Sequence, residues 1–282
     1  MQGRIRFGPA GKPIEFKGDM VRVPEFLRSI GLDALEYEAV RGVRISEDKA
    51  RRLGEAAESS GILLSMHAPY YVNLSSPDPD VVSRSLKRLY DSMVASEWMG
   101  AYAVVVHPGY YKGNSSREEA VKRVIESFNK LVESLPSWVT RPEIAPETMG
   151  KTSQVGSLEE VVEICSNTPR CRPCVDWAHL YARAEGKFVV SVDQVVKAIE
   201  YIERNLGSGA VRPLHTHFSR IEYGRGGERM HHTLAEEEYG PEWSIVCKAY
   251  RETGITAVVI SESPILEKDA LVMKRICEAS EK

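Results

Sequence analysis

Residues 63–109, LLSMHAPYYVNLSSPDPDVVSRSLKRLYDSMVASEWMGAYAVVVHPG, contain one full copy of the pattern that decides the fold. They begin with a short apolar run, 63–67, continue through a stretch of helical period, 79–99, and end in a second apolar run, 102–107. Gly100 stands where the helix should end, because glycine adopts a left-handed C-cap conformation without strain. This order predicts two parallel strands joined by a helical crossover.

The same pattern continues on both sides of this segment. Strands are expected at 4–7, 34–39, 63–67, 102–107, 141–147, 172–176, 212–217 and 256–262. Helices are expected at 24–30, 46–60, 79–99, 116–135, 157–165, 191–206, 241–253 and 268–280, several of them behind a serine cap such as Ser46, Ser116 or Ser157. Eight alternating units favour a single (β/α)8 TIM barrel, formed by residues 1–282 as one domain, over a doubly wound open sheet.

The charge balance limits the classes of partner. The 37 Lys and Arg residues and 40 Asp and Glu residues give a net charge of −3, so no broad basic field is available for nucleic acid. No apolar run reaches the roughly 18 residues of a membrane span, and the start, MQGRIRFGPAGK, lacks the apolar stretch of a secretory signal. We therefore expect no membrane partner and a cytoplasmic location.

The five cysteines include one C-x-x-C pair, Cys171 and Cys174, without a second pair to complete a thiolate zinc site. We expect Cys174 to be buried on a strand with Cys171 at its mouth. A local disulfide or redox pair between the two is the alternative.

Potential metal ligands stand at the ends of six consecutive predicted strands. The strand-end residues are His67, His107, Glu147, Asp176, His217 and Glu262, followed closely by His179, Glu228 and His231. In a barrel these ends converge on one face. Taken singly, a histidine after a strand is usually a hydrogen-bonded structural residue. A potential ligand at each of six successive strand ends favours a metal site instead. Nine candidates exceed the needs of one ion, which predicts two or three ions with Glu147 as a bridge.

Two further histidines are expected to have supporting or structural roles. His215 precedes His217 by two residues and shares its strand face one layer deeper, while His232 is adjacent to His231 and should point elsewhere.

The candidate segments resemble a known family. They are His67-Ala-Pro-Tyr-Tyr-Val-Asn-Leu, His107-Pro-Gly, Glu147-Thr, Val175-Asp-Trp-Ala-His179, His217-Phe-Ser, Glu228-Arg-Met-His231 and Glu262-Ser-Pro. In this order they are similar to the endonuclease IV family of apurinic/apyrimidinic endonucleases, within the xylose-isomerase-like barrels. The resemblance runs from the third to the eighth strand.

The resemblance implies a monomeric, zinc-dependent DNA repair enzyme with three ions, manganese or iron being possible at some sites. The first ion would take His67, His107 and Glu147; the second Glu147, Asp176, His217 and Glu262; the third His179, Glu228 and His231. The substrate would be double-stranded DNA with abasic sites, hydrolysed 5′ to the lesion to leave a 3′ hydroxyl.

DNA contact would come from the strand-end loops. The resemblance places Tyr70, Tyr71, Arg41 and Arg44 where the family inserts side chains into the helix, and the alternative is that the tyrosines pack at the rim and the arginines are solvated. Arg220, Arg225 and Arg229 are candidates for a second local basic patch.

The chain also departs from the family pattern. Glu228-Arg-Met-His231 is one residue longer than the usual Asp-Arg-His, so the third metal site is the least secure. Two other functions therefore stay open: a sugar isomerase or epimerase of the same superfamily, and a damage-binding protein with little turnover.

Overall fold

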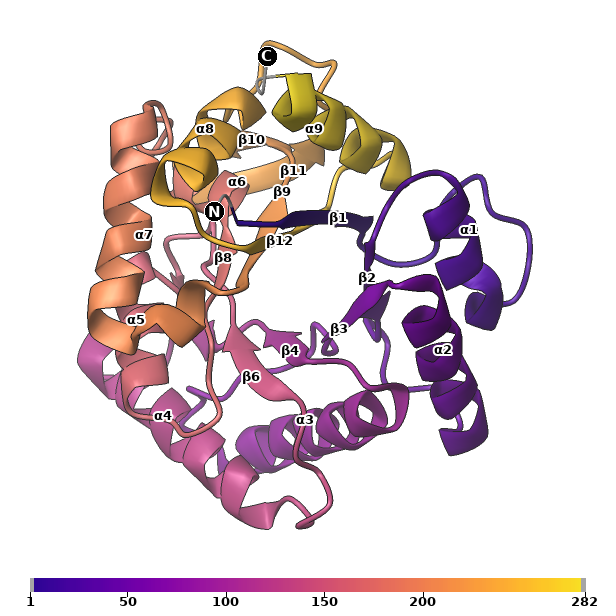
Figure 1. Ribbon diagram of the computed structural model, residues 1–282. Coiled ribbons are helices and arrows are strands. Elements are labelled where there is room, and N and C mark those ends of the chain that lie inside the picture. The colour runs from indigo at the N-terminus through magenta and orange to yellow at the C-terminus, as the bar shows by residue number, and fades with distance from the viewer. Residues whose placement is uncertain (1–2, 280–282) are drawn as a thin grey trace.

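Eight parallel strands form a closed ring in the computed structural model, which describes residues 3–279 (Figure 1). The ring strands are β1 (Ile5–Pro9), β2 (Ala34–Glu38), β3 (Leu63–His67), β4 (Ala103–Val106), β6 (Glu143–Pro146), β8 (Cys174–Asp176), β9 (Leu214–Phe218) and β12 (Ala257–Ser261). The first and last residues of each strand lie within two residues of the predicted bounds. The expected α/β TIM barrel is confirmed.

The ring consists of two four-stranded ladders in the orders β1-β12-β9-β8 and β2-β3-β4-β6. Parallel bridges close the two gaps between them: Ala10 with Glu36 on one side, Ile144 with Cys171 and Glu147 with Cys174 on the other. Closure removes the free strand edges and brings all the strand ends to the same two faces.

Helices cover the outside of the ring (Figure 1). They are α1 (Val23–Ser29), α2 (Glu47–Ser60), α3 (Pro79–Met99), α4 (Arg117–Ser134), α5 (Leu158–Ser166), α7 (Val192–Leu206), α8 (Trp243–Thr253) and α9 (Glu267–Ala279). Ser46, Ser116 and Ser157 cap their helices as predicted, and Gly100 ends α3 in the left-handed conformation. Ser280, the expected end of the last helix, lies outside the described residues.

The core lies between the ring and its helices. Its largest fully buried side chains include Trp177, Trp243 and Tyr250. The indole of Trp177 donates to Tyr250 Oη at 2.7 Å, and that hydroxyl donates to Thr216 on β9 at 3.0 Å. These bonds satisfy polar atoms that burial would otherwise leave unpaired, and they fix α6 (Trp177–Arg183) and α8 against the barrel.

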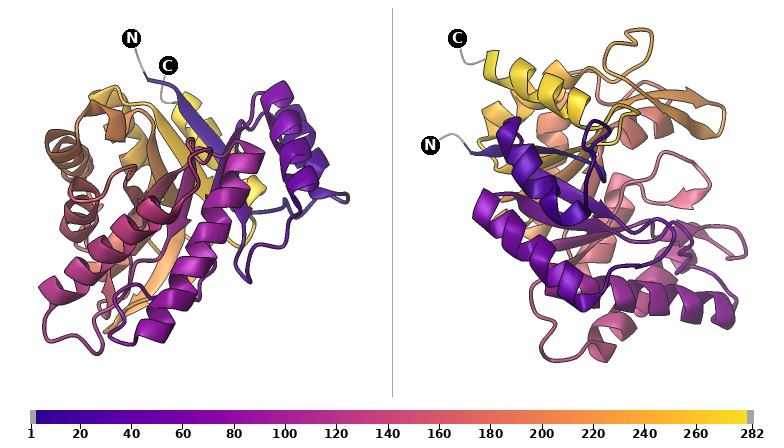
Figure 2. Two further views of the ribbon diagram at one scale, coloured as in Figure 1. Left: turned by 90° about the horizontal axis from the view of Figure 1, so that it is seen from below. Right: turned by 90° about the vertical axis from the view of Figure 1, so that its right-hand side faces the viewer.

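Several elements depart from the predicted pattern. Helix α6 follows β8 directly, and the segment after β9 forms an antiparallel hairpin of β10 (Arg220–Gly224) and β11 (Gly227–His232), for which no strands were predicted. A second small antiparallel pair, β5 (Gly109–Tyr110) with β7 (Gln154–Val155), joins the segment after β4 to the segment after β6. In side view, the hairpin projects at the end opposite to the two chain termini (Figure 2).

The cysteines pair differently from the alternative considered for Cys171. Cys171 is joined to Cys165, and Cys247 to Cys277, whereas Cys174 is a free buried thiol. The expectation of a buried Cys174 on a strand is confirmed, and the alternative pair of Cys171 with Cys174 does not form: Cys174 packs in a small cluster with barrel residues, while Cys171 meets the last turn of α5. Among the described residues, no helix combines the length and apolar character needed to cross a membrane.

Candidate metal centre

The carboxyl ends of the barrel strands bring the predicted ligands to one face. His67 ends β3, Asp176 ends β8, and His217 lies one residue before the end of β9. Single residues beyond β4, β6 and β12 supply His107, Glu147 and Glu262.

Glu147 lies at the centre of this group and is fully buried. Its Oε2 is 3.3 Å from Nε2 of His67 and 3.1 Å from Nε2 of His107. Its Oε1 is 3.2 Å from Nδ1 of His179 and 3.2 Å from Nδ1 of His217. Each carboxylate oxygen thus faces its own pair of imidazoles.

The ligand atoms form sets that fit metal ions. Those within 4.8 Å of one another include His67, His107 and Glu147; Glu147, Asp176, His179 and Glu262; and His179, His231 and Glu262. Two ligands at a tetrahedral angle around zinc lie about 3.3 Å apart, which agrees with the Glu147 contacts. Oδ2 of Asp176 is buried without a hydrogen-bond partner, an arrangement that costs free energy unless a cation compensates it.

The hairpin explains how Glu228 and His231 meet His179 despite their wider spacing. The β10–β11 register shifts between Glu222 and Tyr223, which pair with Met230 and Glu228 and leave Arg229 as an extra residue. This bulge changes the side-chain alternation by one, so residues three apart can face the same side. Oε2 of Glu228 is 3.2 Å from Nε2 of His179, and the rings of His179 and His231 are 5.3 Å apart.

Glu228 has other partners as well. Its Oε2 accepts from the backbone N–H of Gly150 at 3.1 Å, and its Oε1 is 3.7 Å from the ammonium of Lys151. The compact three-ligand set around His179 and His231 is completed by Glu262.

Without metal, the buried charges shift the ligands' proton affinities. Burial alone would lower the pKa of His67, but its contact with Glu147 and the charge of Glu38 raise that pKa to about 10. Burial raises the pKa of Asp176 to about 6. For Glu262 burial acts in the same direction, but the facing His217 outweighs it and lowers the pKa to about 2. The metal-free site is a network of ion pairs.

The predicted DNA-contacting side chains differ in their exposure and contacts. Tyr70 stacks on His107 at 5.2 Å between ring centres, whereas Tyr71 is 71% exposed. Arg41 and Arg44 are exposed in the loop between β2 and α2. The arrangement leaves Tyr71 and both arginines accessible to a ligand at the mouth.

Arg220 and His232 lie on the β10–β11 hairpin, and the structure contradicts the expectation for the first and agrees with that for the second. Arg220 is not available for a basic patch: it is 5% exposed, pairs with Glu242 at 2.9 Å and donates to the carbonyl of Leu234. His232 points elsewhere than His231, as expected, and stacks on Tyr239 with ring centres 3.7 Å apart.

Two buried carboxylates on β2 were not predicted as site residues. Glu36 and Glu38 are two residues apart, so they share the strand face that points into the barrel. Glu36 contacts both His215 and His217, and burial raises the pKa of Glu38 to about 8. The alternation of LEYE at 35–38 was the available signal.

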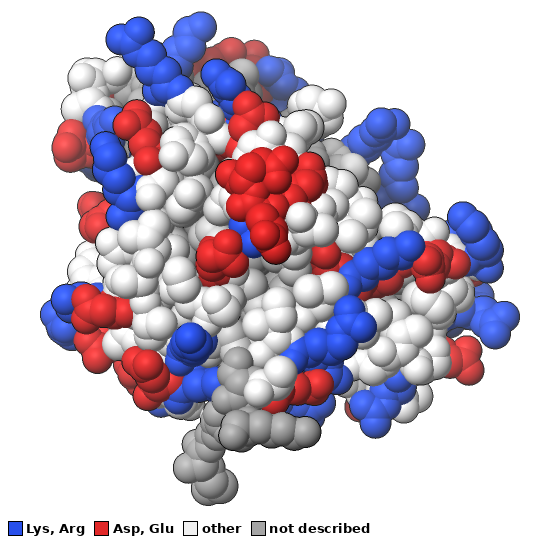
Figure 3. Space-filling model, turned by 90° about the horizontal axis from the view of Figure 1, so that it is seen from above, with Lys and Arg blue, Asp and Glu red and all other residues white. Residues whose placement is uncertain are grey.

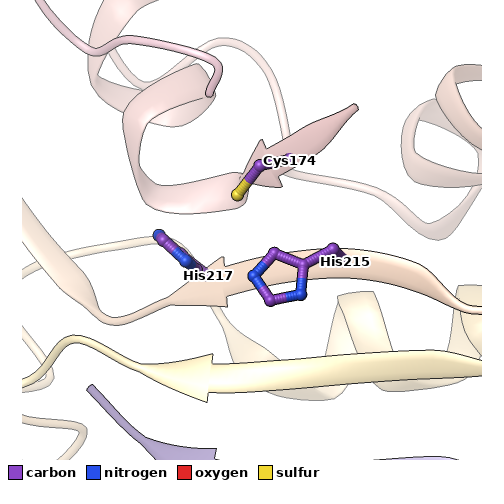
Figure 4. Close-up of side chains that lie close together, drawn as sticks. All are labelled: Cys174, His215 and His217. Carbon is purple, nitrogen blue, oxygen red and sulfur yellow. The ribbon is translucent and has the colours of Figure 1, made fainter. Parts of the chain in front are cut away.

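A further group, Cys174, His215 and His217, lies across neighbouring strands β8 and β9 (Figure 4). Both nitrogens of His215 already have partners, Tyr102 Oη at 2.5 Å and Glu36 Oε2 at 2.9 Å. His215 is therefore a buried hydrogen-bonded residue, in keeping with the supporting role expected for it.

Seen from above, positive and negative side chains are interspersed, with one compact acidic group (Figure 3). The described part of this face carries no continuous basic field, in agreement with the net charge of −3.

Fold and site together define a TIM-barrel protein with histidine and carboxylate groups able to hold metal at the carboxyl ends of its strands. A sequence model described as xylose isomerase-like TIM barrel matches residues 24–276. The chain therefore belongs to this family.

One relative with a similar sequence is uncharacterized, and another is named for the expected activity. An uncharacterized protein of Methanocaldococcus jannaschii is 35% identical over 269 residues, which cover 95% of each chain. A probable endonuclease 4 of Acholeplasma laidlawii is 27% identical over 220 residues, covering 70% of this chain and 72% of the relative.

Solved structures show the same fold in proteins of different activity. Endonuclease IV from Thermus thermophilus superposes with a TM-score of 0.66 at 20% identity, covering 98% of both chains. D-Psicose 3-epimerase from Clostridium cellulolyticum gives a TM-score of 0.62 at 17% identity, covering 99% of this chain and 96% of that one. At these identities the likeness establishes the fold alone.

Proposed function

We propose that this protein is a metal-dependent DNA repair endonuclease that hydrolyses the phosphodiester 5′ to abasic sites in double-stranded DNA. The observation that carries the proposal is the central carboxylate of Glu147, with two imidazoles at each oxygen. A bridging carboxylate of this kind suits neighbouring ions about 3.5–4 Å apart, the arrangement used for in-line displacement at phosphorus.

The proposed ligands follow the strands. His67, His107 and Glu147 would hold one ion; Glu147, Asp176, His217 and Glu262 a second; and His179, Glu228 and His231 a third, with Glu262 close to His179 and His231. Zinc fits this nitrogen and oxygen set, and manganese or iron are alternatives at individual positions. Bound ions supply positive charge against the phosphate and make water a stronger acid.

The burial gradient indicates where the phosphate would enter. Glu147, Asp176, His67 and His217 form a buried floor, whereas the side chains of His107 and His231 are 21% and 27% exposed. These two ligands lie on the solvent side, and His107 stacks on Tyr70. We place the scissile phosphate over His107 and His231. The four buried ligands would lie beneath it, where water is excluded.

The tyrosines and arginines of the mouth would contact the DNA. Tyr71 offers an exposed aromatic ring for the gap left by the missing base, while Arg41 and Arg44 would pair with phosphates. Local contacts of this kind, with the charge of the bound ions, compensate for the absence of a broad basic face.

The second candidate is a sugar isomerase or epimerase. The set Glu147, Asp176, His179 and Glu262 is by itself sufficient for one ion that polarises a hydroxy-ketone, and epimerases share the fold. In that function, His67, His107, Glu228 and His231 would have no evident role.

An incision assay separates the two. We expect the metal-loaded protein to cut a labelled duplex containing one tetrahydrofuran abasic analogue, leaving a 3′ end that a DNA polymerase extends. Chelation should abolish cutting and added zinc should restore it. Interconversion of a ketose by fully loaded protein that leaves the duplex intact would replace the endonuclease with the isomerase.

A further inference from the structure

A continuous line of buried polar contacts runs from the barrel interior to the proposed metal site. Tyr102 Oη lies 2.5 Å from Nδ1 of His215, whose Nε2 lies 2.9 Å from Oε2 of Glu36. Oε1 of Glu36 is 2.9 Å from Nε2 of His217. The side chains of Glu36, His215 and His217 have no exposed surface.

Hydrogen-bond stoichiometry fixes the form of His215. The carboxylate of Glu36 only accepts, so Nε2 of His215 carries a hydrogen and donates it. Nδ1 then accepts from the hydroxyl of Tyr102. Ser65 Oγ donates to the same Oε2 of Glu36 at 2.7 Å. One oxygen of Glu36 is thereby satisfied by two donors.

The other oxygen of Glu36, Oε1, faces Nε2 of His217. Among the described residues, neither Oε1 of Glu36 nor Nε2 of His217 has an aligned hydrogen-bond partner, although the two atoms are at hydrogen-bond distance. On the opposite edge of the imidazole, Nδ1 of His217 lies 3.2 Å from Oε1 of Glu147 and 3.1 Å from Oε1 of Glu262.

We propose that Glu36 is a positioning residue for His217: its carboxylate holds the hydrogen on Nε2 and leaves the Nδ1 lone pair directed at the metal. A histidine ligand commonly donates its second ring N–H to a carboxylate, which sets the ring orientation and raises its basicity. Glu36 serves this purpose from β2, a strand without one of the proposed ligands. The inference rests on the metal ligation proposed above, and not on the DNA substrate.

Zinc affinity is the first measurement. We expect Glu36→Gln to bind zinc about 10–100-fold more weakly than the parent in competition with a chromophoric chelator, the usual cost of losing such a partner. Two variants are controls. Ser65→Ala keeps the carboxylate of Glu36 and removes one of its donors, and Cys174→Ala removes the thiol beside His217 (Figure 4). Both controls should stay within about threefold of the parent.

A spectroscopic readout separates positioning from general damage. In zinc-loaded protein labelled with 15N-histidine, the parent should show a slowly exchanging Nε2–H of His217, assigned by its absence in His217→Gln. Glu36→Gln should shift this signal upfield or broaden it, because the neutral amide is a weaker acceptor. The signal should be unchanged in Ser65→Ala.

The outcomes are distinguishable. Parental zinc affinity and an unchanged His217 signal in Glu36→Gln would overturn the inference, as would a loss of affinity in Cys174→Ala equal to that in Glu36→Gln. If Glu36→Gln does not fold, Glu36→Asp keeps the charge but withdraws it from His217, and the same loss is expected. Absence of zinc binding by the parent would instead overturn the proposed metal centre.

Discussion

Oε1 of Glu147 lies 3.2 Å from Nδ1 of His217, and this contact connects the two ladders of the barrel. Glu147 follows β6 in one ladder, and His217 lies on β9 in the other, 70 residues later. Barrel closure therefore creates the centre of the site.

Replacement of Glu147 tests its bridging role. Glu147→Gln removes the charge that four imidazoles share, so we expect loss of at least one ion per chain and a fall in incision of about 100-fold or more. Elemental analysis and the duplex assay measure these effects. Glu143→Gln is the control, since Glu143 lies on the same strand and pairs with Arg172 outside the site. Parental activity of Glu147→Gln would exclude the bridge.

His107 distinguishes the two candidate functions. His107→Gln should reduce abasic-site incision about 10–100-fold, because His107 faces Glu147 at 3.1 Å but is not a member of the set with Asp176. If the protein is an isomerase, ketose interconversion should survive the same change. His232→Gln is the matched histidine control, because His232 stacks on Tyr239 instead. Equal incision by both variants would contradict the assignment.

Tyr71 tests the DNA-facing rim. Tyr71→Ala should raise KM for abasic duplex by about tenfold with little change in kcat, since stacking on a base contributes about 1–3 kcal/mol. Trp138→Ala provides an exposed aromatic control: Trp138 is 49% exposed, and it precedes β6, at the other end of the barrel. A fall in kcat alone would place Tyr71 in the chemistry instead of in binding.

The stability of the metal-free protein should fall as the pH rises. Burial raises the pKa of Glu38 from 4.5 to about 8, and for His67 the contact with Glu147 and the charge of Glu38 outweigh burial and raise it from 6.5 to about 10. The folded state then binds more protons than the unfolded state across about pH 6.5–8, so each raised group loses its stabilising effect there.

Urea unfolding of chelated protein at several pH values measures this slope, which Glu38→Gln should flatten. Zinc binding should also release protons, detectable by calorimetry in buffers of different ionisation enthalpy, because His67 must lose its proton to bind. Metal-free stability that rises over this window would contradict the prediction.

The disulfides should stabilise the barrel unequally. Cys247–Cys277 encloses 30 residues and ties α8 to α9, so replacing both by alanine should cost about 3–4 kcal/mol of unfolding free energy. Cys165–Cys171 encloses only 6, with about 2 kcal/mol expected. Denaturant midpoints of the two double variants measure the difference. Equal midpoints would show that loop length does not control the effect.

Local patterns predicted most elements because their causes are local. Serine caps, glycine C-caps and apolar periodicity act over a few residues, so helix boundaries such as those of α3 follow from the sequence. Helix α6 was missed because its seven residues directly follow a predicted ligand, Asp176. The β10–β11 hairpin was missed because its strands are polar and its bulge breaks the alternation.

The candidate site was predicted only as a set of strand ends. Glu36 and Glu38 stood within a predicted strand, but the face of that strand that points inwards depends on its register with β3. The expected availability of Arg220 was wrong because the loop after the hairpin folds back over its guanidinium.

The sequence by itself determined a barrel of eight β/α units and the residue types at its mouth, because helix periodicity, caps and strand ends are encoded over short distances. The tertiary structure decided which atoms meet. The pairing of each Glu147 oxygen with its imidazoles, the bulge that turns Glu228 and His231 to one side, and the contact of Glu36 with His217 all depend on strand register and closure. These contacts join residues far apart in the sequence, whose relative positions are fixed only when the ring is complete.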